Sequence, residues 1–504
     1  MPIIQTADIS PEIKWTSGAQ HQAYCGLDCC VTLEVLEAIL PQLAARPLAA
    51  QIYDFEKALQ APYLDIMKRG FRVDELARRK AAEGLRARSA SLQSTLDTLA
   101  ATIWDKGLNP NSSKQLQDFL YNACKFPKST IFQKGVRKIS TNREALEKLE
   151  DHLYARPFTS SILTLRDWAK QLQVFEQEID QDGRFRTSYN IAGTETGRPS
   201  SSEGAFGTGG NAQNIAPGLR HVFIADESFK LCVIDLEQVE ARDVGFFEGC
   251  LFNDWKFLDN CESGDLHTLN AQLIWPELDW TNNPKANRII ADGIFYRDFT
   301  YRDMAKRGSH LSNYSGSSWT MARSLKIPQE IAENFQLRYC RGTSPAYPAH
   351  QRWWQWTATQ LQTKRSLTTP FGRQRYFYGR PDDASTLREA IAFLPQSTTA
   401  DRMNLALWRV WRHEPSVQLL AQTYDSITFQ APDDANFDSL ISRILTQHIP
   451  VELRSPSNRS YIVPGEAKVG YNWGYGSPSN KEGLIKWVPG QDKRKRLSGL
   501  DRLG

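Results

Sequence analysis

The sequence predicts an α+β protein in which a helical insertion interrupts a central sheet. Residues 55–170 show mainly helical periodicity, and a strand-like apolar run follows at 230–235. Helical patterns return over 265–380 and 385–413, and strand-like runs follow at 423–430 and 461–463. The order is therefore helical arm, sheet, helical insertion and sheet again, which is a nested architecture.

The composition is that of an ordinary folded protein. The 504 residues are too many for one compact core, so two to four lobes are expected. Hydrophobic residues make up 41% and charged residues 23%, and no apolar run approaches the roughly 18–20 residues that a membrane span needs. No export signal is visible, and the eight cysteines form no C-x-x-C pair, which argues against a zinc site or a disulfide framework. We expect a reduced cytoplasmic setting, with no membrane partner.

The first long helical region has the features of an arm. Residues 77–101 alternate charged and apolar side chains at helical spacing. A polar loop with serine caps opens a helix near residue 112, and residues 140–144 fit another helix start. A long helical arm with polar tips is suited to gripping an elongated partner. The net charge of +4 does not decide what that partner is.

Two separated apolar runs each end on an aspartate. Asp235 closes the run 230–235, and Asp425 closes the run 419–425. A strand that ends in Asp presents its carboxylate at a sheet edge, and two such carboxylates can share a pair of magnesium ions when the substrate brings a triphosphate. Taken alone, either residue is more often a strand-end aspartate that caps a turn.

A basic stripe lies between the two acids. Arg302, Lys306, His310 and Tyr314 are spaced by four, so on a helix they share one face. Arginine and lysine bind phosphate oxygens, and the aromatic end can approach a sugar and a base. Such a stripe is more often a basic helix face exposed to solvent. An exposed face does not require the aromatic residues at its end, however.

At these residues the chain resembles DNA polymerase family A. Residues 235–242, Asp-Leu-Glu-Gln-Val-Glu-Ala-Arg, are similar to the first catalytic segment, usually Asp-Tyr-Ser-Gln-Ile-Glu-Leu-Arg. Residues 302–314 resemble the nucleotide-binding helix, and Tyr424-Asp425-Ser426 resembles the last segment, usually His-Asp-Glu. Minor signatures agree in order at 194–201, 213–215, 265–267, 370–373 and 468–473, and the likeness covers roughly residues 52–475.

The resemblance implies a right-hand fold with a helical thumb, an antiparallel-sheet palm and helical fingers. It divides the chain into a remnant of a 3′–5′ exonuclease-like domain (1–50), a thumb (51–185), the first part of the palm (186–263), fingers (264–384) and the second part of the palm (385–504). The implied activity is template-directed DNA synthesis with primer–template DNA and dNTPs. The implied cofactor is two Mg²⁺ ions, with Mn²⁺ as a substitute.

The resemblance also assigns residues. The metal ligands are Asp235, Asp425 and the carbonyl of Leu236, and Lys306 is the acid that protonates the pyrophosphate. The nucleotide is bound by Gln238, Glu240, His267, Arg302, Lys306, His310 and Tyr314, with Glu240 as the steric gate against a ribose 2′-hydroxyl. DNA is contacted by Arg198, Asn214, Arg242, Arg373, Arg388, Gln396 and Gln422. Donors such as Arg and Gln suit this task because every correct base pair presents acceptors in the minor groove.

Several positions depart from the family pattern. Ser426 replaces the usual Glu, Tyr424 replaces His, Glu237 replaces Ser, and His310 stands where Phe or Tyr is usual. Several of these variants are of the phage type. Tyr24 and Asp28 resemble the last exonuclease segment, but its earlier acidic segments are absent, so we expect no proofreading by this chain. A separate exonuclease or processivity subunit is a candidate partner.

Two other functions remain open at this point. Asp235 and Glu237 mimic the Asp-x-Glu of metal-dependent nucleases, because residues i and i+2 of a strand face the same way. Alternatively, the basic patches and the serine at 426 suit a DNA-binding subunit without catalysis.

Overall fold

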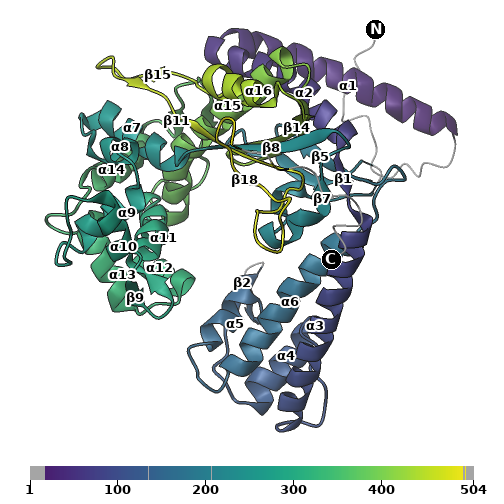
Figure 1. The fold of residues 1–504 in the computed structure, drawn as a ribbon, viewed down its shortest axis with the longest axis vertical. Coiled ribbons are helices and arrows are strands. Elements are labelled where there is room, and N and C mark those ends of the chain that lie inside the picture. Colours follow the sequence, from purple (N-terminus) through teal and green to yellow (C-terminus); the bar gives the residue numbers. More distant parts are fainter. Residues whose placement is uncertain (1–17, 134–135, 206, 492–493, 495–504) are drawn as a thin grey trace.

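The computed structural model describes residues 18–133, 136–205, 207–491 and 494. The outer parts of the first and last predicted segments, 1–17 and 495–504, therefore lie outside the described residues. Figure 1 shows a central sheet with helices above it and two arms that extend below it. Within the described part, none of the helices combines the length and the apolar character that crossing a membrane requires.

The central sheet is antiparallel and has the order β13-β14-β8-β17-β18. Its two faces differ because side chains alternate along each strand. Cys232 and Ile234 on β8 share one buried cluster with Ile427 and Phe429 on β14. Asp235 therefore belongs to the opposite face. The strands are β13 (Gln418–Thr423), β14 (Ser426–Pro432), β8 (Phe229–Leu236), β17 (Gly465–Gly470) and β18 (Ile485–Lys486).

Helices cover the apolar face of the sheet, and together with it they form the palm. They are α2 (Pro47–Arg69), α15 (Ala384–His413), α16 (Phe437–Arg443) and the π-helical turn η6 (Ile444–His448). The periodic pattern at 385–413 is confirmed as one helix. Most of helix α2 falls in the segment predicted as thumb, but it packs on the palm: Tyr63 donates to Asn404 at 2.8 Å, and Trp411 donates to Asp65 at 2.6 Å.

The first arm, which we call the thumb arm, comprises residues 75–176. Helices α3 (Glu75–Ala101) and α6 (Arg156–Glu176) pack along each other and carry a small tip. The expected caps are present, since Ser112 accepts from the backbone of Gln115 and Asn142 accepts from that of Ala145. The tip consists of α4 (Ser113–Gln117), the π-helical turn η2 (Asp118–Ala123), the hairpin β2 (Thr130–Gln133) and β3 (Val136–Ile139), and α5 (Arg143–Leu149).

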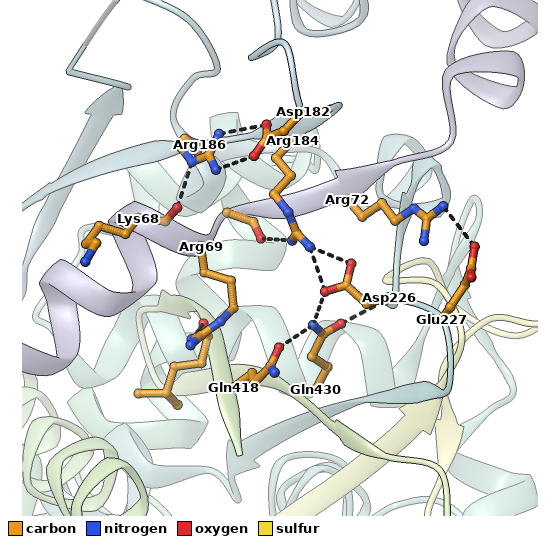
Figure 2. Close-up of polar contacts among 12 residues, drawn as sticks. Lys68, Arg69, Arg72, Asp182, Arg184, Arg186, Asp226, Glu227, Gln418 and Gln430 are labelled. Atoms are coloured by element: carbon orange, nitrogen blue, oxygen red, sulfur yellow. Dashed lines mark hydrogen bonds and ion pairs between the residues drawn. The ribbon is translucent and has the colours of Figure 1, made fainter. Parts of the chain in front are cut away.

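An arginine-rich network lies where the chain returns from the thumb arm to the palm. Arg184 makes two hydrogen bonds of 2.7 Å to Asp226, which also accepts from Gln430 on β14 at 2.6 Å (Figure 2). Arg186 pairs with Asp182 and donates to the carbonyl of Lys68 at the end of α2. These half-buried links lie at the root of the arm. A small sheet lies there too, and its strands are β4 (Arg184–Phe185), β1 (Phe71–Val73) and β7 (Phe223–Ile224).

The second arm, which we call the fingers lobe, comprises residues 256–363. It packs around its own buried cluster, which includes Phe257, Met304, Phe335 and Trp353. Helix α7 (Val239–Phe252) connects it to the palm strand β8. Its elements are α8 (Lys256–Glu262), α9 (Leu266–Ile274), α10 (Pro284–Ala291), β9 (Ile294–Tyr296), β10 (Phe299–Thr300), α11 (Tyr301–Asn313), α12 (Ser318–Leu325), α13 (Gln329–Gln336), η5 (Leu337–Arg341) and α14 (Ala349–Thr363).

The remaining elements are short, apart from one N-terminal helix. Helix α1 (Gly18–Ala44) is exposed along most of its length and contacts α2. The short elements are β5 (Thr187–Asn190), β6 (Ser200–Glu203), η3 (Ala212–Asn214), η4 (Pro217–Val222), β11 (Ser366–Thr368), β12 (Gln374–Tyr376), β15 (Leu453–Arg454) and β16 (Ser460–Tyr461).

Candidate active site

The two aspartates come together at one end of the palm sheet. Asp235 is the penultimate residue of β8 and lies directly opposite Ser426 of β14. Asp425 immediately precedes that serine, and its carbonyl accepts a hydrogen bond of 3.1 Å from the backbone N–H of Leu236. The two acids and Leu236 are therefore neighbours, although 189 positions separate the acids in the chain.

The turn that carries Asp425 differs from the sequence expectation. The pattern predicts one strand over 423–430, but β13 ends at Thr423, β14 begins at Ser426, and Tyr424 and Asp425 form the turn between them. Tyr424 has a φ of +55°, and Gln238, three residues after Asp235, has a φ of +51°. Left-handed backbone at bulky residues is uncommon and concentrates at functional sites. Asp425 is thus presented by a tight, constrained turn, whereas Asp235 is presented by the end of strand β8, with the constrained Gln238 shortly after it.

The electrostatics of the pair favour a cation. Burial, followed by the charge of Asp425, raises the pKa of Asp235 to about 7, while Lys468 acts in the opposite direction. Burial also raises the pKa of Asp425, and the nearby Glu240 adds to that effect. Glu466, opposite Asp235 in register on β17, contributes further negative charge. The two carboxylates repel each other when both are ionised, and a divalent cation bound between them would relieve this repulsion.

The donor set fits magnesium better than a soft metal. Hard oxygen ligands surround the position, and Mg²⁺ commonly takes only one or two carboxylates and completes its shell with water and phosphate. Among the residues that the structure describes, no group of three or more His, Cys, Asp and Glu side chains is arranged to hold an ion. The two carboxylates would supply only part of a magnesium shell, and water or phosphate oxygens would supply the rest.

Helix α11 carries the predicted basic stripe. Arg302 makes a two-pronged ion pair with Asp265, the residue that caps α9, at 3.0 and 2.9 Å. Lys306 is exposed. His267 lies beside them, and burial together with the charges of Arg302 and Lys306 lowers its pKa to about 4. This corner of the fingers lobe carries excess positive charge, which suits an anion such as a polyphosphate.

The other end of α11 reaches the palm through Glu240. The Tyr314 hydroxyl donates to one carboxylate oxygen of Glu240, and Arg198 pairs with the other. His310, one turn earlier, is exposed and packs edge-on against the Tyr314 ring with centroids 5.5 Å apart. The buried amide oxygen of Gln238 has no hydrogen-bond partner among the described residues. The predicted nucleotide-binding residues on α7 and α11 therefore converge.

A buried polar network that sequence reasoning missed lies beneath this contact. Glu248 on α7 hydrogen-bonds His350 Nδ1 at 2.5 Å, and His350 Nε2 lies 3.0 Å from the amide oxygen of Asn313. Both side chains of the Glu248–His350 pair are at most 1% exposed. Asn313 directly precedes Tyr314, so this pair fixes the same end of α11. Residue spacing carries no signal for it, because the residues come from three separate helices.

The predicted DNA-contacting residues fall into two groups. Asn214 and Arg388 are exposed, and Arg198 and Gln396 are half-buried. By contrast, Arg242 is 7% exposed and Gln422 only 1% exposed. Arg373 is also largely buried, because it pairs with Asp401 and Glu56. The first group can therefore reach a ligand directly, whereas the second group is held inside the protein.

Comparison with known proteins is consistent with this geometry. The family model for DNA polymerase family A matches residues 80–475. The thermostable DNA polymerase I of Thermus thermophilus is 28% identical over 345 residues, covering 65% of this chain and 38% of that protein. The DNA polymerase I of Chloroflexus aurantiacus is 24% identical over 493 residues, covering 91% of this chain and 47% of that protein. The chain thus spans about half the length of the curated relatives, or less.

A solved structure supports the fold. The polymerase domain of Pol1 from M. smegmatis, in complex with DNA primer-template and dNTP, superimposes with a TM-score of 0.68. The match covers 88% of this chain and 74% of that one, at 22% identity. The predicted α+β class and right-hand polymerase fold are confirmed by this likeness. Since the family model spans most of the chain, the protein belongs to DNA polymerase family A.

Proposed function

We propose that the chain is a DNA-directed DNA polymerase that adds dNTPs to a primer 3′-hydroxyl. The observation that carries the proposal is the pairing of Asp235 and Asp425 at one sheet edge, with the basic helix α11 joined to that edge through Glu240. The family assignment supports the proposal, and so does the similar Pol1 structure, which is a complex with DNA primer-template and dNTP.

The chemistry requires two magnesium ions at the paired carboxylates, with manganese as a substitute. Asp235, Asp425 and the carbonyl of Leu236 would hold them, and the ions would lower the pKa of the primer hydroxyl and neutralise the departing phosphate. Lys306 Nζ would deliver a proton to the pyrophosphate oxygen. Arg302 and His267 would bind the triphosphate, for which Arg302 must share or release its hold on Asp265.

Sugar selection is assigned to the contact between α7 and α11. Glu240 is held by Tyr314 and Arg198, so its side chain cannot easily turn away from a 2′-hydroxyl. His310 and Gln238 complete the surroundings of the nucleotide. The half-exposed or exposed group, Arg198, Asn214, Arg388 and Gln396, would contact the primer–template. The buried group, Arg242, Arg373 and Gln422, would act indirectly by holding neighbouring residues in place.

The division into thumb, palm and fingers at the boundaries given above remains part of this proposal, with α2 reassigned to the palm. Proofreading is not expected from this chain.

A primer-extension assay tests the proposal. A labelled primer on a defined template is incubated with the four dNTPs and Mg²⁺, and the product is sequenced. We expect a faithful complement of the template, lost in Asp235→Ala and kept in the matched variant Asp434→Asn, whose side chain is exposed in the loop after β14. Degradation of a labelled single strand without dNTPs, abolished by Glu237→Ala, would instead identify a nuclease. Tight binding with no incorporation at any metal concentration would identify a non-catalytic subunit.

A further inference from the structure

The tip of the thumb arm touches the fingers lobe across the space between the two arms. Lys326 Nζ lies 2.6 Å from the carboxylate of Glu150, which makes an ion pair between the C-terminal cap of α12 and that of α5. Arg323 adds a longer contact of 3.4 Å to the backbone carbonyl of Glu144. We call this contact the tip bridge. It connects residues about 180 positions apart in the sequence, with no part of the palm between them.

The two sides of the tip bridge carry complementary charge. A cleft of about 560 Å³ lies between them. Its charged lining residues are Glu147, Glu150, Asp151 and Arg156 on the thumb side and Arg297, Arg323 and Lys326 on the fingers side, so acids outnumber cations only on the thumb side. Acids at the tip of an arm that grips DNA are electrostatically unsuited to phosphate. They are suited to a basic protein surface, which the fingers lobe provides.

Both ends of the ion pair are held in position. Glu150 is 12% exposed at its side chain, and its other oxygen accepts from Ser160 on α6 at 2.9 Å. Lys326 ends α12 with a left-handed backbone, a conformation typical of helix C-caps. Arg323 stacks over the Trp319 ring at 4.7 Å. The bridge is therefore a defined contact between two fixed helix ends.

The tip bridge closes a ring of contacts. The thumb arm is rooted on the palm through a buried cluster that packs Leu85 and Phe175 with Leu231 of β8, beside the Arg184–Asp226 network (Figure 2). The fingers lobe is rooted there through α7 and the Tyr314–Glu240 bond. Both arms extend from the sheet on the side away from α2, α15 and α16, and Asp235 belongs to that open face (Figure 1). An elongated ligand at the acids would lie inside this ring.

We propose that the tip bridge encloses duplex DNA at the active site, so that the chain holds its primer–template topologically during synthesis. The inference rests on the proposed function, since it takes DNA as the ligand of the open face. Lys326 is 63% exposed, so water weakens the ion pair from that side and the bridge can open to admit DNA. Once closed, the bridge prevents the DNA from leaving sideways between the two arms, while the protein can still slide along the duplex.

A cross-linking experiment tests the enclosure directly. Glu150→Cys and Lys326→Cys are combined in a background in which the exposed Cys25, Cys29 and Cys30 are serine, and the arms are joined with a short bis-maleimide after DNA binding. The DNA is a primed single-stranded circle or the same molecule linearised. We expect the cross-linked protein to stay on the circle through a wash at about 1 M salt, where screening reaches within ~3 Å, and to leave the linear form. Equal loss from both DNAs, or equal retention on both, overturns the proposal.

The matched control places both cysteines on the thumb arm. Glu147→Cys with Asp151→Cys uses the same chemistry in the same cleft but joins no second arm, so it should leave both DNAs. Retention by this control on the circle would also contradict enclosure. No dNTP is present, so the outcome does not depend on catalysis, and a parent protein that fails to extend primers would refute the proposed function separately.

A charge-reversal series tests the consequence for synthesis. Glu150→Lys should shorten the product made per binding event by roughly two- to five-fold, as expected for a contact of about 1 kcal/mol, without changing the rate of the first incorporation. The double variant Glu150→Lys with Lys326→Glu should restore the product length. A product length unchanged in the single variant, or not restored in the double variant, would show that the bridge plays no part in processive synthesis.

Discussion

Replacing Asp235 by Asn should stabilise the protein while it abolishes synthesis. The pKa of Asp235 is raised from 3.8 to about 7 by burial and by Asp425. A carboxyl whose pKa is higher in the folded state binds its proton more tightly there. The contribution of Asp235 to folding stability is therefore fully present below the pKa that this carboxyl has in the unfolded chain, and it is lost as the pH rises towards 7. Asparagine cannot ionise and so escapes this loss.

The gain in folding free energy from Asp235→Asn follows from the pKa difference of about three units. Each unit corresponds to about 1.4 kcal/mol, so the gain is at most about 4 kcal/mol. Structural relaxation reduces the expected gain to roughly 2–4 kcal/mol at pH 8.5. Urea unfolding in EDTA at pH 5 and pH 8.5 measures it. The stabilising effect should be much larger at pH 8.5 than at pH 5. The exposed Asp298→Asn should change stability little at either pH.

Magnesium provides a second arm of the same experiment. At pH 8.5 added Mg²⁺ should stabilise the parent protein, because the cation relieves the repulsion between Asp235 and Asp425, and it should stabilise Asp235→Asn less. The reasoning is refuted if Asp235→Asn is no more stable than the parent at pH 8.5, or if Mg²⁺ stabilises both proteins equally.

Three further outcomes are expected. Glu240→Ala should raise ribonucleotide incorporation about tenfold or more in single-nucleotide assays, whereas the isosteric Glu240→Gln should retain discrimination; equal behaviour would remove the steric role. Arg302→Gln should lower kcat/KM for dNTP by about 100-fold and lower the folding stability by about 1 kcal/mol near neutral pH. Because Arg302 lowers the pKa of Asp265, the stability difference between variant and parent should disappear on acidification, and a difference that does not change with pH would contradict this pairing. Glu248→Leu and His350→Phe should each cost about 3 kcal/mol in urea unfolding, and the double variant much less than their sum; additive costs would show that the two side chains are not coupled.

The sequence predicted the parts of the site that depend on local pattern. Alternation along β8 fixes which face Asp235 occupies, and the four-residue spacing fixes the stripe from Arg302 to Tyr314. These are short-range consequences of strand and helix geometry. The hydrogen bond from Tyr314 to Glu240 joins two separate helices, and local pattern does not specify it.

Long-range partners were beyond local pattern. The Asp265 carboxylate that holds Arg302, the pair of Glu248 with His350, and the tip bridge each join side chains from different elements. Charge counts and periodicity carry no information on such pairing, because any exposed helix can present the same residues. The turn at Tyr424 was missed for another reason: a bulky residue with positive φ lacks the glycine or asparagine signal by which turns are recognised.

The shared role of Asp235 and Asp425 is tested most directly by single-turnover incorporation of one dNTP at saturating Mg²⁺. Asp425→Asn should slow incorporation at least about 100-fold while primer–template binding persists, and Asp434→Asn should match the parent. Incorporation by Asp425→Asn at the parental rate would contradict the assignment of the paired aspartates as the catalytic centre.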